Sequence, residues 1–284
     1  MTEKKQIIVS DSKQDINNEK KSGNIKKEKT EFKEKDVTLR VFRINGQIDS
    51  PKYDEYTVST KRWTTVLDAL LDIKNFKDSS IAIRYSCRMA SCGSCGMKIN
   101  GIPRLACYTK ISELSGDTIT CEPLPNFPYI RDLVTDFTTF FENHKNMLPY
   151  VQNPKADLKP EEKLSEFVQS PSDLDKFLQF SYCIKCGLCY SACPTVATDT
   201  KFPGPQALAQ AYRYTADSRD TDMKNRFNII DDRHGIWRCH FAGSCSSVCP
   251  KGVDPALGIQ LLRNHLLGFS KHEKTVAKLK EHSD

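Results

Sequence analysis

Two cysteine-rich runs in the second half of the sequence have the spacing that iron–sulfur clusters require. Residues 183–194 read CIKCGLCYSACP, which is the pattern C-x2-C-x2-C-x3-C-P. Residues 239–250 read CHFAGSCSSVCP, which is the same pattern with Ala242 in place of its second cysteine. In proteins that bind two clusters through this pattern, the fourth cysteine of each run ligates the cluster held by the other run. The two runs are therefore candidates for a pair of interlocked metal sites.

The crossing of the fourth cysteines divides the thiolates of these runs into two sets. The complete set has four thiolates and predicts a [4Fe-4S] cluster, with the ligands Cys183, Cys186, Cys189 and Cys249. The other set lacks a thiolate at Ala242 and predicts a [3Fe-4S] cluster, with the ligands Cys193, Cys239 and Cys245. The alternative is a decayed second site without a cluster. Three cysteines remain at the positions that the pattern requires, which argues against this alternative.

A third group of cysteines lies in the first half of the sequence, within YSCRMASCGSCGMKINGIPRLAC. Its spacing is that of plant-type [2Fe-2S] ferredoxins and predicts the ligands Cys87, Cys92, Cys95 and Cys107. The small residues between them would let backbone amides approach the sulfurs and offset their negative charge. A structural zinc site is the alternative, but zinc frameworks usually pair two C-x2-C knuckles, and this group has one. Cys121 is left over, and we expect it to be a small buried residue with no role in ligation.

The composition favours reduced, metal-binding thiols over disulfides. The chain of 284 residues has twelve cysteines and shows no signal peptide near Met1, so nothing predicts export to an oxidising compartment. The apolar runs fall short of the roughly 20 residues that a transmembrane helix needs. The formal net charge of +6 is mild, and acidic residues are scattered among the basic ones, which argues against a nucleic-acid partner.

The elements that must position these cysteines fall into regions of different periodicity. Residues 1–36 hold ten lysines, eight acidic residues and no arginine, which predicts a disordered charged tail and does not fit a mitochondrial transit peptide. Residues 37–128 read as an α+β domain, in which one helix packs on a sheet. We expect a helix capped by Thr64 and strands at residues 37–41, 56–58, 81–85, 97–99, 105–106 and 118–122.

Three prolines within residues 122–128 predict the end of this domain, because proline continues neither a central strand nor a helix interior. Beyond them the apolar pattern is helical, so we expect an all-α domain at residues 129–268 and a charged C-terminal tail at residues 269–284. The last expected helix has Asp254 as its N-cap and Pro255 at its first position. The helical patterns cover residues 130–141, 174–180, 207–214 and 256–267.

The sequence offers little means of breaking bonds in a substrate. It has no recognisable Rossmann glycine fingerprint, no P-loop and no nucleophile with an evident base. Three clusters of different kinds favour a graded path for electrons, with different redox partners at its two ends. We therefore expect an electron-transfer protein without a substrate-converting site of its own.

The three cysteine patterns and several other stretches resemble the iron–sulfur subunit of succinate dehydrogenase and fumarate reductase. The resemblance spans about residues 37–268 and is very specific. It implies a β-grasp [2Fe-2S] ferredoxin domain that docks on a flavoprotein with FAD, followed by an all-α ferredoxin-like domain with two clusters that sits on membrane-anchor subunits. The other stretches are EPLPNFPYIRDL at 122–133, YRYTADSRD at 212–220, RCH at 238–240 and CPKGVDP at 249–255.

The resemblance also implies a place for the protein in a membrane complex. Electrons would pass between FAD and a membrane quinone through [2Fe-2S], [4Fe-4S] and [3Fe-4S] clusters, at the cytoplasmic face of the cell membrane. Pro194 and His240 match the family's quinone site, where His240 could donate a hydrogen bond or a proton to a quinone oxygen. A solvated histidine, or one that supports a cluster ligand, is the alternative for His240.

Two features leave the physiological reaction open. Residues 195–198 lack the tryptophan of ubiquinone-using relatives, which favours menaquinone or another low-potential quinone. The stretch GLCYSACP resembles the fumarate reductase branch, whereas RCH resembles the dehydrogenase branch. A subunit of a soluble thiol-linked fumarate or disulfide reductase is a further alternative, but it would need additional cysteines, and none follows Cys249.

Overall fold

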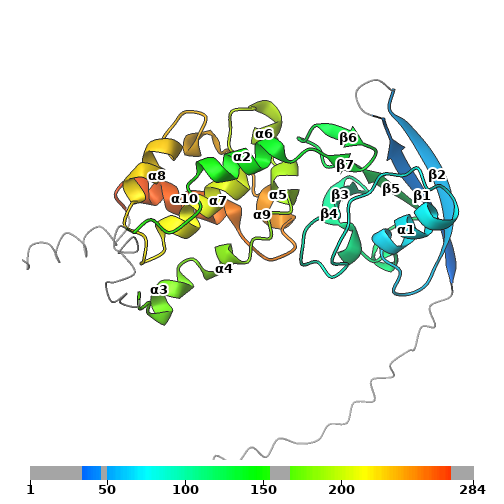
Figure 1. The fold of residues 1–284 in the computed structure, drawn as a ribbon, viewed down its shortest axis with the longest axis horizontal. Helices are drawn as coiled ribbons and strands as arrows, with labels where there is room; N and C mark the ends of the chain where they lie inside the picture. Colours follow the sequence, from blue (N-terminus) through cyan, green and yellow to red (C-terminus); the bar gives the residue numbers. More distant parts are fainter. Residues whose placement is uncertain (1–33, 46–49, 154–166, 270–284) are drawn as a thin grey trace, which may run out of the picture. The chain divides into compact units, whose positions relative to one another are not determined.

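The computed structural model describes residues 34–45, 50–153 and 167–269 (Figure 1). The predicted charged tails at residues 1–36 and 269–284 lie almost wholly outside the described residues. Within the overlap, Lys35 and Asp36 already belong to the first strand, slightly before the position that the sequence pattern predicted. Among the described residues, no helix combines the length and the apolar character needed to cross a bilayer.

The first part of the described chain forms a five-stranded mixed sheet with one helix. The strand order across the sheet is β2-β1-β5-β3-β4, in which β1 and β5 are parallel and the other neighbours are antiparallel. This topology confirms the predicted β-grasp domain. Figure 1 labels its elements, which are β1 (Lys35–Arg43), β2 (Lys52–Thr60), α1 (Val66–Phe76), β3 (Gly96–Ile99), β4 (Ile102–Leu105) and β5 (Thr118–Glu122).

Residue alternation in β1 directs one face of the sheet into the core. Val37, Leu39 and Val41 are buried, whereas Arg40 between them is exposed, as a period of two predicts. The apolar stripe of α1 lies in the same core and consists of Val66, Leu67, Ala69, Leu70, Leu71 and Ile73. Burial of these side chains supplies the main driving force that folds the domain.

The helix α1 begins one residue later than predicted. Oγ1 of Thr65 accepts a hydrogen bond from the Asp68 amide at 3.2 Å, and the Asp68 carboxylate accepts one from the Thr65 amide at 3.0 Å. This reciprocal pair is a capping box. The hydroxyl of Thr64, which the sequence pattern predicted as the cap, instead accepts a hydrogen bond from the Lys61 amide at 2.9 Å.

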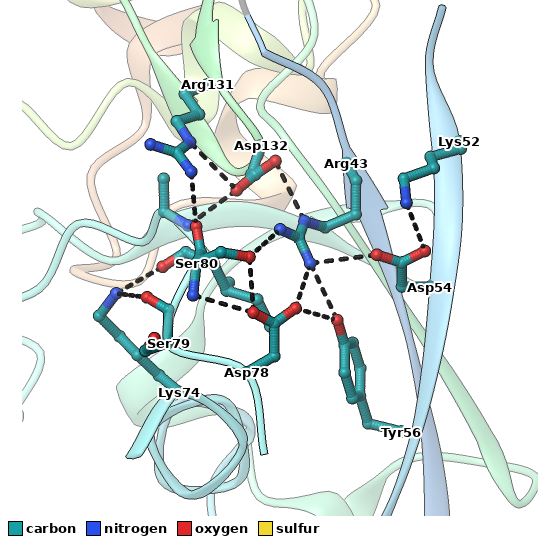
Figure 2. A network of polar contacts seen from close by, with 12 residues as sticks. Arg43, Lys52, Asp54, Tyr56, Lys74, Asp78, Ser79, Ser80, Arg131 and Asp132 are labelled. Atoms are coloured by element: carbon teal, nitrogen blue, oxygen red, sulfur yellow. Dashed lines mark hydrogen bonds and ion pairs between the residues drawn. The ribbon is translucent and has the colours of Figure 1, made fainter. Parts of the chain in front are cut away.

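A polar network surrounds Arg43 (Figure 2) and reaches the segment that was predicted as a strand at residues 81–85 through the Ala82 amide. The guanidinium of Arg43 is within 3.2 Å of the carboxylates of Asp54, Asp78 and Asp132. Asp132 also accepts a hydrogen bond from the Ala82 amide at 2.8 Å. The predicted strand is therefore wrong, because a side chain binds a backbone group that a strand ladder would have used.

Residues 129–135 form a hairpin instead of the start of the helix predicted at 130–141. Its strands are β6 (Tyr129–Arg131) and β7 (Val134–Thr135). Asp132, in its turn, has a φ of +47°, a left-handed conformation that a helix interior does not use. The prediction is wrong over the first half of this stretch. Since buried Asp132 is bonded to the sheet domain, we now propose the domain boundary after this hairpin rather than at residue 128.

Beyond Thr135, the described residues form α-helices and short 3-10 turns and no strand, as predicted for an all-α domain. The predictions at residues 207–214 and 256–267 are confirmed, and Asp254 caps the last helix through the Leu257 amide at 2.9 Å. The helix predicted at 174–180 is divided in two. The α-helices are α2 (Thr138–Asn146), α3 (Pro171–Asp175), α4 (Leu178–Ser181), α5 (Leu188–Ser191), α6 (Pro194–Thr198), α7 (Pro205–Thr215), α8 (Met223–Ile230), α9 (Ser244–Ser247) and α10 (Pro255–Leu266).

The proline-rich segment at residues 122–128 is bonded to the helix α5. The side-chain amide of Asn126 donates hydrogen bonds to three backbone carbonyls at the C-terminal end of α5, those of Tyr190, Ser191 and Cys193. The ring of Phe127 lies next to that of Tyr190, with centroids 5.0 Å apart. These contacts connect the end of the sheet domain to one of the cysteine runs.

Candidate iron–sulfur sites

The loop that carries the first cysteine group directs backbone amides at sulfur atoms. The amides of Ser91 and Cys92 both lie 3.2 Å from Sγ of Cys87, and the amide of Ala90 lies 3.3 Å from Sγ of Cys107. The predicted small residues of this loop therefore do bring N–H groups close to the sulfurs. Such hydrogen bonds offset the negative charge that thiolate ligands carry.

Left-handed backbone conformations produce this inward arrangement of amides. Arg88, Ala90 and Gly93 have φ angles of +55°, +55° and +76°. Only glycine adopts such angles without a steric penalty, so the backbone is strained at Arg88 and Ala90. Strain of this kind is typical of functional sites.

The fourth cysteine of this group comes from the far side of the β3–β4 hairpin. Cys107 lies in a 3-10 turn, Ala106–Tyr108, directly after β4, and its amide is 3.4 Å from Sγ of Cys95. Both of these cysteines are buried, and burial raises the pKa of Cys95 to about 12. Cys92 is exposed, and hydrogen bonds from Ser94 and the Cys87 amide lower its pKa to about 6. The structure thus gathers all four predicted residues.

The second set of cysteines surrounds one cavity. The cavity walls combine cysteines with apolar side chains, among them Ile184, Leu188 and Val253. Gln206 is a buried polar side chain of this wall. The cysteines on the wall are those that the crossing rule grouped together, namely Cys183, Cys186, Cys189 and Cys249.

The third set surrounds a separate cavity. Its wall includes Ala242 at the position where the repeat lacks a cysteine, together with Phe202 and Ile259. The cysteines on this wall are Cys193, Cys239 and Cys245. The fourth cysteine of each run thus lines the cavity of the other run, as the spacing predicted.

The chemistry of these walls fits iron–sulfur clusters. Burial raises the pKa of Cys186 to about 12 and that of Cys245 to about 11, so these thiols need nearby positive charge to ionise at neutral pH. Iron ions would supply that charge, and thiolate is the usual protein ligand of such clusters. Within the described ranges, no three His, Cys, Asp or Glu side chains are grouped as ligands of a single ion.

Sequence reasoning did not find Gln206 or Asn126. Gln206 is a buried amide on the apolar face of α7, one residue after the proline that begins the helix. A polar residue inside an otherwise apolar helical stripe was the available signal. Asn126 lies within the proline-rich segment, where nothing in the local pattern indicates partners more than sixty residues away.

The two residues predicted for a quinone site are both at the surface. Pro194 and His240 are exposed and follow directly after Cys193 and Cys239, and Pro194 also lines the third cavity. Cys121, which was predicted to be a core residue, is fully buried on β5 opposite Val41. Burial raises its pKa to about 12.

Comparisons with known proteins agree with this arrangement. Residues 38–142 match the profile of a 2Fe-2S iron-sulfur cluster binding domain, and residues 179–253 match that of a 4Fe-4S dicluster domain. The chain is 44% identical over 231 residues to the fumarate reductase iron-sulfur subunit of Haemophilus influenzae, covering 78% of this chain and 90% of that protein.

Two further relatives extend the comparison. The mitochondrial succinate dehydrogenase [ubiquinone] iron-sulfur subunit of Dictyostelium discoideum is 38% identical over 237 residues, which cover 81% of this chain and 82% of that protein. A chain from a structure of the Mycobacterium smegmatis Sdh1 complex in the apo form superposes with a TM-score of 0.72 at 28% identity, covering 82% of this chain and 97% of that one. The chain therefore belongs to the family of fumarate reductase and succinate dehydrogenase iron-sulfur subunits.

Proposed function

We propose that this protein is the electron-transfer subunit of a succinate dehydrogenase or fumarate reductase complex. The observation that carries the proposal is the pair of separate cavities, one lined by four cysteines and the other by three cysteines and Ala242. Family membership supports the same function. The family includes subunits named for both directions of the reaction, so the proposal covers succinate oxidation and fumarate reduction.

Each cysteine set has a proposed cluster. Bound iron–sulfur clusters would supply sites that accept and release single electrons. The chain's own residues position and insulate those sites, through the amides of the first loop and the apolar walls of the two cavities. The proposed ligands are Cys87, Cys92, Cys95 and Cys107 for [2Fe-2S], Cys183, Cys186, Cys189 and Cys249 for [4Fe-4S], and Cys193, Cys239 and Cys245 for [3Fe-4S].

The proposed partners stand at the two ends of this series. A flavoprotein subunit with FAD would exchange electrons with the [2Fe-2S] end, and a membrane quinone with the [3Fe-4S] end. Oxidation of succinate to fumarate releases two electrons and two protons, and reduction of a quinone to a quinol consumes the same number. We place the protein as a peripheral subunit, bound to membrane-anchor subunits at the cytoplasmic face of the cell membrane.

We further propose that Pro194 and His240 contribute to the quinone site. Both are exposed, and both adjoin cysteines of the third cavity. An exposed imidazole in this position can donate a hydrogen bond or a proton to a quinone oxygen. His240→Ala should then impair quinone reduction by the assembled complex while electron transfer from succinate to an artificial acceptor continues. Equal loss of both activities would contradict this role.

Metal analysis and EPR of the purified complex test the cluster assignment. The three cluster types sum to about nine irons per chain, and zinc should be absent. The air-oxidised protein should show a [3Fe-4S] signal. Ala242→Cys should replace that signal with a [4Fe-4S] centre, because the added thiolate completes the third cavity. Ala242→Ser serves as the size-matched control without a thiolate. A spectrum of Ala242→Cys identical to wild type would overturn the assignment.

A further inference from the structure

Two glycines of the first cysteine loop contact a cysteine of the second cavity. A Cβ atom added to Gly93 would lie 2.7 Å from Cβ and 2.9 Å from Cα of Cys186. A Cβ atom added to Gly96 would lie 3.3 Å from the Cys186 carbonyl oxygen. The two distances from the added Cβ at residue 93 are shorter than nonbonded carbon atoms allow, so residue 93 has no room for any side chain. The backbones of the two loops are therefore in direct contact.

The contact joins residues that adjoin or belong to two proposed ligand sets. Gly93 directly follows Cys92, Gly96 directly follows Cys95, and Cys186 is itself a proposed ligand of the second site. The route from the first loop to Cys186 thus crosses a single nonbonded gap between Gly93 and Cys186. Electron tunnelling weakens steeply as such a gap widens. A side chain at residue 93 would force the two loops apart.

We propose that Gly93 and Gly96 are positioning residues that hold the first cysteine loop against Cys186 and so set the gap that an electron crosses between the first and second sites. This inference rests on the function proposed above. The step moves one electron, so that one site is oxidised and the other is reduced. No bond forms or breaks, and no proton is transferred.

The residue that follows Cys186 is also a closely packed glycine. Gly187 has a φ of +78°, and a Cβ atom added there would lie 2.7 Å from the ring of Phe137. That ring in turn stacks on Phe127, with centroids 4.4 Å apart. The second loop thus contacts the first loop at Cys186 and the packed aromatic pair at Gly187. A shift of the second loop away from Gly93 would therefore also disturb the packing of Gly187 against Phe137.

The test compares Gly93→Ala with Gly101→Ala in the purified complex. Gly101 lies in the same domain and has a similar positive φ of +81°, but an added Cβ would meet nothing within 4 Å. Gly101→Ala thus reproduces the backbone strain without the clash. The main measurement is EPR relaxation of the [2Fe-2S] signal when the second centre is also reduced, because this magnetic interaction depends on the distance between the two centres. Iron content is measured in parallel.

We expect Gly93→Ala to weaken the relaxation enhancement of the [2Fe-2S] signal while Gly101→Ala leaves it at the wild-type level. Hydrogen exchange of peptides that cover residues 183–190 should increase in Gly93→Ala and stay at the wild-type level in Gly101→Ala. Gly96→Ala, whose added methyl is less crowded, should change both measurements in the same direction by a smaller amount. If Gly93→Ala loses its [2Fe-2S] iron, its EPR relaxation cannot be measured. The relaxation and exchange of Gly96→Ala, compared with those of Gly101→Ala, then test the inference.

Equal behaviour of the loop variants and Gly101→Ala in relaxation and in exchange would overturn the inference. The exchange measurement does not need a bound cluster. The failure of the proposed function and the failure of this inference can thus be told apart. Absence of iron from the wild-type protein would refute the proposed function. Unchanged hydrogen exchange in Gly93→Ala and Gly96→Ala would refute the loop contact. An exchange increase without a change in relaxation would show that the glycines support the fold but do not set the gap, which also overturns the inference.

Discussion

Nε2 of Gln206, a residue that lines the second cavity, lies 3.1 Å from Nδ1 of His144. Burial, together with the nearby charge of Lys185, lowers the pKa of His144 to about 4, so its imidazole is neutral at pH 7. Neutral Nδ1 can accept a hydrogen from the amide, which orients Gln206. Burial raises the pKa of Cys183, and a hydrogen bond from Gln206 counteracts part of that rise. His144 therefore helps direct an amide donor at a proposed cluster ligand.

The first prediction concerns the reduction potential of the second centre. Gln206→Leu should lower this potential, because a hydrogen bond to a ligand sulfur stabilises the more negative, reduced state of a cluster. A redox titration of the complex followed by EPR measures the change. Gln210→Leu is the matched control, since Gln210 is also buried on α7 but donates to the Phe180 carbonyl at 2.9 Å. Equal shifts in the two variants would contradict the role of Gln206.

The second prediction concerns the bonds between Asn126 and the end of α5. Asn126→Gly should destabilise the protein by about 1–3 kcal/mol, because backbone carbonyls lose their donor while the positive φ of +66° stays favourable. Asn126→Ala should cost more, by roughly 1 kcal/mol, because alanine is strained in that conformation. Thermal unfolding of the purified complex measures both. An unfolding temperature equal to wild type for Asn126→Gly would show that these hydrogen bonds contribute nothing.

The grouping of the cysteines could be predicted from the sequence because the spacings typical of iron–sulfur ligands are short and repeated. The crossing rule even assigned Cys193 and Cys249 to the cavities of the opposite runs, which the structure reproduces although 56 residues separate these two cysteines in the sequence. A spacing rule of this kind carries long-range information. The β1 strand and the helix α10 could be predicted for a simpler reason, since their periodicity and caps are local.

The errors arose where a distant side chain determines the backbone. Ile81 and its neighbours have an apolar strand pattern, but their amide partner is Asp132, fifty residues away. Asp132 also ends the helical pattern at residues 130–141, through a left-handed turn that no local signal indicates. The contact between Gly93 and Cys186 escaped prediction for the same reason. The only sign of this contact in the sequence is the glycine at position 93, and the left-handed backbone of the loop is by itself a sufficient reason for a glycine there.

The third prediction concerns acid stability and the Arg43 network. Hydrogen bonds from Ser80, Tyr56 and Arg43 hold the pKa of Asp78 well below its usual range. The folded state therefore binds this proton less readily than the unfolded chain does. The stabilisation by Asp78 is fully present above the unfolded pKa of about 4, and it is lost as the pH falls towards the folded value.

Asp78→Asn should accordingly destabilise the protein by roughly 1–3 kcal/mol at pH 7, and its difference from wild type should narrow as the pH falls below about 4. Unfolding temperatures across a pH series measure this difference. Asp117→Asn, which removes an exposed carboxylate on the same domain, is the control, and its unfolding temperature should match that of wild type at every pH. Any loss of clusters in acid should affect this control and Asp78→Asn alike. A constant difference between Asp78→Asn and wild type at all pH values would contradict the prediction.

The fourth prediction concerns Cys121, which has a high pKa and lies opposite Val41 and Ile99 in the sheet. Cys121→Ala should retain all iron and every cluster signal, because the thiol lies in the apolar core rather than on a cavity wall. It should lower stability by about 1–2 kcal/mol through lost burial and a small void. Cys107→Ala is the contrasting variant and should lose the [2Fe-2S] signal. Iron analysis and EPR of both proteins decide, and loss of iron from Cys121→Ala would make Cys121 a ligand after all.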